Sequence, residues 1–129
     1  MSTAEAKKRV LIVDDEESMR LLLRRVIEPI PGVEVALADG CDEALQLAGK
    51  SGYDLILLDL LMPGVGGIEV LNRIRAGSQN ARTPVIIVSM MSDSATRIVC
   101  QSLGASDYVV KPIERERVVA AVKSQLNLP

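Results

Sequence analysis

Short runs of Val, Ile and Leu alternate with amphipathic stretches along the chain, and this alternation limits the fold more than any other feature. The runs lack polar alternation, which is typical of parallel strands covered on both faces. We expect strands at Arg9–Val13, Val33–Leu37, Leu55–Leu58, Val85–Val88 and Tyr108–Val110.

The stretches between and after these runs have apolar residues at helical spacing, which predicts five helices. Pro29, Gly77 and Gly104 stand where three of them should end. The expected stripes are Met19, Leu22, Leu23, Val26 and Ile27; Cys41, Ala44, Leu45 and Ala48; Gly67, Val70, Leu71 and Ile74; Ala95, Ile98, Val99 and Ser102; and Val118, Val119, Val122 and Leu126. Strands alternating with helices predict an α/β fold, a doubly wound parallel sheet with helices on both faces.

Length and composition exclude several classes of protein. The 129 residues suit one domain, residues 1–129, with no effector domain in this chain. The chain has no Trp and no Phe, so we expect an aliphatic core. A net charge of −2 without a basic block argues against nucleic-acid binding by this segment.

No apolar run approaches the roughly 20 residues that a membrane span needs, and Met1 to Lys8 lack the apolar stretch of a signal peptide. We therefore expect a cytoplasmic protein without membrane association. Cys41 and Cys100 stand in no metal-binding spacing, which predicts reduced thiols. The absence of His excludes Ser-His-Asp and Cys-His nucleophiles and a His-ligated zinc.

Polar residues follow the expected strands at the point where each strand ends. Asp14 and Asp15 follow the first strand, Asp59 the third, Ser89 the fourth and Lys111 the fifth. In open parallel sheets, ligands bind beyond these carboxyl ends. Three carboxylates at one edge repel each other unless a proton or a cation intervenes, and oxygen ligands suit Mg²⁺. A carboxylate can also serve as a nucleophile that forms an aspartyl phosphate.

Each of these residues has a more ordinary explanation when taken singly. Acidic residues after a strand usually favour the N-terminus of the following helix, a lone Ser is usually a turn or cap residue, and a Lys-Pro pair usually marks a loop. Their joint occurrence at successive strand ends favours a functional site.

Four segments resemble the receiver domain of two-component response regulators: Val10–Asp15, Asp54–Gly64, Pro84–Ser89 and Gly104–Pro112. They extend over almost the whole chain. The resemblance implies a flavodoxin-like (βα)5 fold with strand order 2-1-3-4-5.

The resemblance also implies roles for individual residues. Asp59 would accept a phosphoryl group from a sensor histidine kinase or a phosphotransfer protein. Asp14, Asp15, Asp59 and the backbone carbonyl of Leu61 would hold Mg²⁺, with Mn²⁺ as a substitute.

Ser89, the backbone of Met90, and Lys111 would bind the phosphoryl oxygens. The bond from Lys111 to Pro112 would be cis. Tyr108 would be an aromatic switch, against the simpler interpretation of a half-buried strand residue with a hydrated hydroxyl.

The output surface implied by the resemblance is the face of the fourth helix, fifth strand and fifth helix. It would include Arg97, Gln101, Tyr108, Arg115 and Val119 and would bind a downstream protein, as a monomer or a phosphorylation-dependent dimer. The chain would not be an enzyme beyond its own phosphorylation and slow autodephosphorylation.

The sequence departs from similar domains near the phosphorylation site. Met90 replaces a small residue and should crowd the pocket. Leu61 and Met91 cannot orient an attacking water, which predicts slow autodephosphorylation. The alternative is that Met90 and Met91 only pack under the fourth helix. Gly66 stands where an acidic residue is common and is expected to cap the third helix.

Four other functions remain open. An aspartyl phosphatase or phosphotransferase would favour an acid two residues beyond the nucleophile, and Leu61 at this position argues against such an enzyme. A flavodoxin-like cofactor site would favour Gly and hydroxyls rather than Asp14 and Asp15. A degenerate receiver would act as an interaction scaffold, and the sequence would also suit an N-terminal receiver fragment of a longer regulator with an effector domain.

Overall fold

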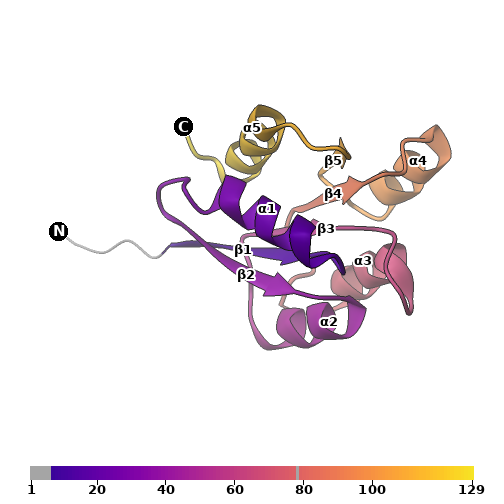
Figure 1. Ribbon diagram of the computed structural model, residues 1–129. Helices are drawn as coiled ribbons and strands as arrows, with labels where there is room; N and C mark the ends of the chain where they lie inside the picture. Colours follow the sequence, from indigo (N-terminus) through magenta and orange to yellow (C-terminus); the bar gives the residue numbers. More distant parts are fainter. Residues whose placement is uncertain (1–6, 78) are drawn as a thin grey trace.

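The computed structural model describes residues 7–77 and 79–129. Five strands form one parallel sheet in the order β2-β1-β3-β4-β5 (Figure 1). Their bounds are β1 Lys8–Val13, β2 Val33–Ala38, β3 Leu55–Leu58, β4 Val85–Ser89 and β5 Asp107–Val110. The expected doubly wound α/β fold and its strand order are therefore confirmed.

Helices cover both faces of this sheet. Buried side chains of α1 and α5 belong to one hydrophobic cluster, and those of α2, α3 and α4 belong to the other. Figure 1 shows α1 and α5 on one side of the strands and α2 and α3 on the opposite side. The helices are α1 Glu17–Ile27, α2 Cys41–Lys50, α3 Gly66–Ala76, α4 Ser94–Ser102 and α5 Arg115–Leu126.

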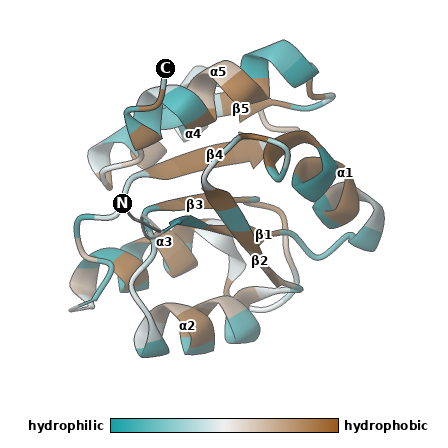
Figure 2. Cartoon of the chain, turned by 90° about the vertical axis from the view of Figure 1, so that its left-hand side faces the viewer, coloured by the Kyte–Doolittle hydropathy of each residue, from teal (hydrophilic) through white to brown (hydrophobic). Residues whose placement is uncertain are grey.

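The core is aliphatic, as the composition predicts. The central strands β3 and β4 are buried along their whole length, and Tyr53 is the one aromatic side chain in the buried core of the described residues. Figure 2 shows the strands as mostly apolar, whereas the surrounding helices carry both apolar and hydrophilic residues. Rows of Val, Ile and Leu suit such strands because branched side chains pack well on a sheet covered on both sides.

The helix α4 buries a different face from the one that its apolar stripe predicts. Ile98 is 61% exposed and Val99 is also exposed, whereas Thr96 and Cys100 face the core. Burial of Thr96 is tolerated because its hydroxyl donates to Asp93 Oδ2 at 2.8 Å. In α1 the prediction of a buried Leu22 is also wrong, since Leu22 is exposed beside the buried Leu23.

Glycines mark two helix ends as expected, and a third behaves differently. Gly77 follows α3, and Gly104 follows α4 with a φ of +91°. Gly66 was expected to cap α3, but the helix begins at Gly66 and Val65 is the capping residue. The φ of +83° at Gly66 is a conformation that residues with a side chain rarely adopt.

Neither cysteine is in a disulfide, and both are buried. Within the described residues, no helix has the length and apolar character needed to cross a membrane. Residues 1–6, which carry most of the expectation about a signal peptide, lie outside the described part.

Candidate functional site

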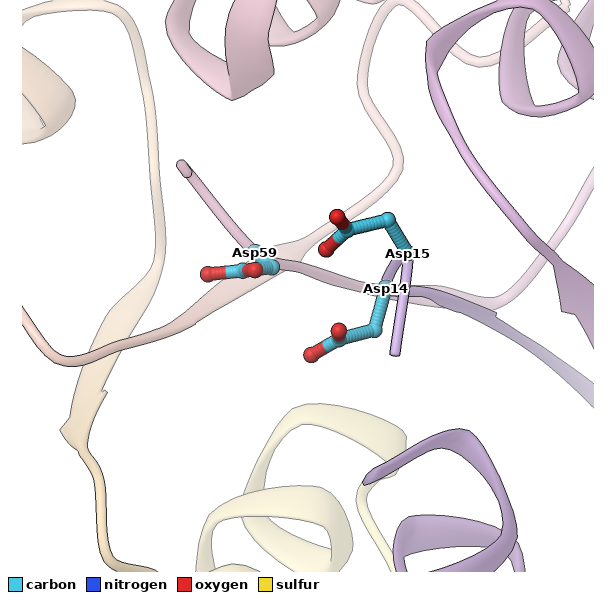
Figure 3. A group of neighbouring side chains, drawn as sticks. All are labelled: Asp14, Asp15 and Asp59. Carbon is cyan, nitrogen blue, oxygen red and sulfur yellow. The ribbon is translucent and has the colours of Figure 1, made fainter. Parts of the chain in front are cut away.

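Three carboxylates meet at the carboxyl edge of the sheet because β1 and β3 are neighbours in register. Val13 pairs with Leu58, so the residues that follow, Asp14 and Asp59, emerge side by side. Asp15 comes next in the chain. One carboxylate oxygen from each of the three lies within 4.8 Å of the others. Figure 3 shows the three side chains extending from these two strand ends into a common region.

Lys111, directly after the outer strand β5, brings a positive charge to this group. Its Nζ lies 2.9 Å from Asp14 Oδ2, 3.6 Å from Asp59 Oδ2 and 3.9 Å from Glu16 Oε1. The Lys111 side chain is 7% exposed. Its backbone amide donates to the Ser89 carbonyl at 2.9 Å, which continues the β4–β5 ladder by one residue and fixes where the side chain starts.

Burial dominates the electrostatics of the site. Asp59 is 4% exposed, and this burial, with the charge of Asp14, raises the pKa of the Asp59 carboxyl against the opposing effect of Lys111. Burial would lower the pKa of Lys111, but the hydrogen bond to Asp14 and the charges of Asp14 and Asp59 outweigh it, so its pKa is raised. One buried ammonium thus pairs with Asp14 and Asp59, and the carboxylate of Asp15 lies close to both, so the group as a whole has excess negative charge.

This donor set fits a hard divalent cation. Carboxylate oxygens are the ligands that Mg²⁺ prefers, and Mg²⁺ completes its shell with waters and phosphate oxygens rather than a full protein cage. Asp14, Asp15 and Asp59 place carboxylate oxygens at the ends of two neighbouring strands, and the fourth expected donor is the backbone carbonyl of Leu61. The Leu61 amide lies 3.4 Å from Asp59 Oδ1, and its side chain is exposed.

Ser89, Met91 and Tyr108 form a connected chain beside the acidic group. Ser89 is fully buried at the end of β4, and its hydroxyl accepts a hydrogen bond from the Met91 amide at 3.2 Å. The Tyr108 hydroxyl donates to the Met91 carbonyl at 2.6 Å. The guanidinium of Arg97 lies over the Tyr108 ring, 4.7 Å from its centroid. Tyr108 is thus tied to the loop that begins at Ser89.

The two methionines of this loop behave differently. Met90 is 67% exposed, so it does not pack under α4, whereas Met91 is half-buried and packs against the core.

The Lys111–Pro112 peptide bond is cis, as expected.

Two residues contact the acidic site although the sequence did not place them there. Arg20 Nη1 donates to the backbone carbonyl of Asp14 at 2.8 Å. Gly67 lies against Asp59, so closely that a Cβ built there would be 2.2 Å from the Asp59 carbonyl oxygen. Arg20 carries no local signal, since a long side chain can point in many directions. Gly67 had been assigned only to an apolar helical stripe.

Comparison with known proteins agrees with this geometry. Residues 10–123 match the family model described as the response regulator receiver domain. The transcriptional regulatory protein ResD of Bacillus subtilis is 40% identical over 119 residues, which cover 92% of this chain and 48% of ResD. The chain spans about half the length of the curated relatives it matches. The chemotaxis protein CheY4 of Vibrio cholerae has a similar structure, with a TM-score of 0.86 at 30% identity, covering 94% of this chain and 100% of that one.

Proposed function

We propose that Asp59 is the residue that becomes phosphorylated, on the premise that this chain belongs to the response regulator receiver domain family. Receiver domains are signalling modules of two-component systems rather than enzymes with a turnover of their own. The observation that carries the proposal is the placement of Asp59, buried at the carboxyl edge of the sheet with Asp14, Asp15 and Lys111 around it.

The reaction needs an ionised carboxylate and a site that tolerates a phosphoryl group. An oxygen of Asp59 forms a bond to phosphorus while the bond from phosphorus to a histidine nitrogen of the donor breaks. The electron pair goes to the leaving imidazole, which takes up a proton. Lys111 then exchanges a carboxylate partner for a phosphoryl oxygen, and the hydroxyl of Ser89 and the Met90 amide donate to the others.

Asp14, Asp15, Asp59 and the Leu61 carbonyl would hold the divalent cation. When bound, Mg²⁺ neutralises charge on the phosphoryl group and on the attacking carboxylate. The excess negative charge among these carboxylates supports this assignment, because Lys111 alone compensates only part of it.

Phosphorylation is proposed to reach a partner through the face of α4, β5 and α5. The hydrogen bond from the Tyr108 hydroxyl to Met91 links β5 to the loop after Ser89, and Arg97 on α4 lies over the same ring. A shift of Ser89 toward the phosphoryl group would therefore change the contacts of Tyr108 and Arg97. We propose a sensor histidine kinase or phosphotransfer protein as donor, in the cytoplasm, and a protein target at this face.

A long-lived phosphoryl group is the second part of the proposal. Leu61 and Met91 offer no side-chain group that could orient water, and the side chain of Met90, next to Ser89 in the chain, is exposed. Hydrolysis would then depend on water that the protein does not hold in place.

The decisive experiment is phosphorylation by acetyl phosphate with Mg²⁺, read by intact mass. The wild type should gain one phosphoryl group, and the Asp59→Asn variant should gain none. Asp42→Asn, which removes an exposed acid at the start of α2, should be phosphorylated like the wild type. EDTA should abolish the adduct. An adduct that persists in Asp59→Asn would refute the assignment, and a wild type that takes no phosphoryl group from acetyl phosphate or a kinase would favour the scaffold interpretation.

A further inference from the structure

Arg20 is the one side chain of α1 that holds the backbone of the acidic site. Its Nη1 donates to the Asp14 carbonyl at 2.8 Å. This carbonyl belongs to the peptide that joins Asp14 to Asp15, the two adjacent residues proposed to bind the cation. Within residues 7–77 and 79–129 Arg20 forms no ion pair, so its guanidinium is directed at this peptide instead.

We propose that Arg20 is a positioning residue for the divalent cation: its hydrogen bond fixes the peptide between Asp14 and Asp15 and thereby the separation of their carboxylates. The proposal rests on the proposed metal site. Asp14 is fixed on its other side, because its amide donates to the Ala38 carbonyl at 3.2 Å. Asp15 is exposed, so its direction depends on the peptide that Arg20 holds.

The anchor for this contact is rigid. Arg20 lies in the first half of α1, and Leu23, one turn further on, is almost completely buried in the core together with Val26 and Ile27. The helix therefore cannot follow a movement of the loop without losing apolar contacts. The guanidinium is planar and presents its N–H groups in a fixed geometry, so its hydrogen bond restrains the Asp14 carbonyl relative to α1.

Charge and positioning predict opposite effects of Arg20 on metal binding. As a cation near three carboxylates, Arg20 would weaken the binding of Mg²⁺ by repulsion, so its removal would tighten binding. As a positioning residue, Arg20 would strengthen binding, so its removal would loosen it. The sign of the change in Mg²⁺ affinity therefore separates the two roles without any measurement of phosphorylation.

The test is titration calorimetry with Mg²⁺ alone on metal-free wild type, Arg20→Met and Arg24→Met. Arg24 is an exposed arginine one turn further along the same helix, so its variant removes a charge without touching the Asp14 carbonyl. We expect the Mg²⁺ dissociation constant of Arg20→Met to rise about 10–100-fold, the usual cost of losing a group that orients metal ligands. Arg24→Met should remain within about twofold of the wild type.

Arg20→Lys keeps the charge and covers the case in which Arg20→Met does not fold. Its single ammonium cannot repeat the geometry of the guanidinium, so we expect weaker Mg²⁺ binding than in the wild type. Unchanged or tighter binding in the folded Arg20 variants would overturn the inference. A wild type that does not bind Mg²⁺ at all would instead overturn the proposed metal site.

Discussion

The substitution Gly67→Ala should disturb the site through the backbone alone. Gly67 is the second residue of α3, and its amide donates to the Leu60 carbonyl at 3.0 Å. A Cβ added at Gly67 would lie 2.2 Å from the Asp59 carbonyl oxygen, 2.6 Å from Leu60 Cα and 3.0 Å from the Asp59 carbonyl carbon. All three atoms are backbone, so no side-chain rotation can relieve the overlap.

The size of the effect follows from these distances. Ordinary contacts between heavy atoms need about 3.5 Å, so α3 or the Asp59 segment must move by about 1 Å. Overpacking of a well-packed site costs about 1–3 kcal/mol, and we expect the free energy of unfolding to fall by at least that amount. A displacement of about 1 Å in a reacting group can cost about 100-fold in rate, so phosphorylation of Asp59 should slow by one to two orders of magnitude.

Equilibrium unfolding in urea and the rate of phosphorylation by acetyl phosphate measure the two effects. The matched control is Gly49→Ala, since Gly49 lies near the end of α2 with no atom within 4 Å of a built Cβ. It should raise the free energy of unfolding by about 0.5–1 kcal/mol, because alanine is the better helix former. A Gly67→Ala protein with wild-type stability and wild-type phosphorylation would refute the reasoning.

Three further predictions concern charges and the exposed loop. Burial raises the pKa of Asp59, so Asp59→Asn should increase the stability of the metal-free protein at pH 7, measured by urea unfolding in EDTA; the gain should vanish as the pH falls to about 3.8 and below, where the carboxyl is protonated in both states. Burial alone would raise the pKa of Asp107, but hydrogen bonds from Arg117 and from the Tyr108 amide keep it lowered. The substitution Arg117→Met should therefore reduce the free energy of unfolding by about 0.2–1 kcal/mol at pH 7. Unfolding measured as a function of pH should show this difference disappear below the lowered pKa of Asp107. Met91→Glu should shorten the lifetime of the phosphorylated protein, followed by intact mass after removal of the donor, because a carboxylate can orient the attacking water; an unchanged lifetime would contradict the explanation based on Met91.

The sequence by itself determined the elements of the fold and the identity of the acidic residues. Runs of Val, Ile and Leu without polar alternation are typical of covered parallel strands, and the carboxyl ends of neighbouring parallel strands share one edge. The convergence of Asp14 and Asp59 therefore follows from local pattern once the order of strands is known. That order came from the resemblance to receiver domains, since periodicity does not distinguish one arrangement of parallel strands from another.

The tertiary structure decided which face of α4 is buried. Its apolar stripe predicted that Ile98 and Val99 face the core, yet Thr96 and Cys100 do. A nine-residue helix buries a narrow face, and the choice depends on how the whole helix is held at its ends. The hydroxyl of Thr96 is satisfied by Asp93, so the cost of burying a polar residue, on which the sequence argument relies, is small here.

Contacts between residues of different elements were equally beyond the pattern. Lys111 pairs with Asp14, Asp59 and Glu16. Arg20 donates to the Asp14 carbonyl, and Gly67 packs closely against Asp59. Each of these contacts depends on the relative positions of separate segments in the folded chain. Local periodicity indicates which residues are candidates for burial, because burial depends mainly on apolar area. It does not say which neighbours they meet, because hydrogen bonds and steric contacts depend on distances of a few ångströms, and only the packed chain sets those distances.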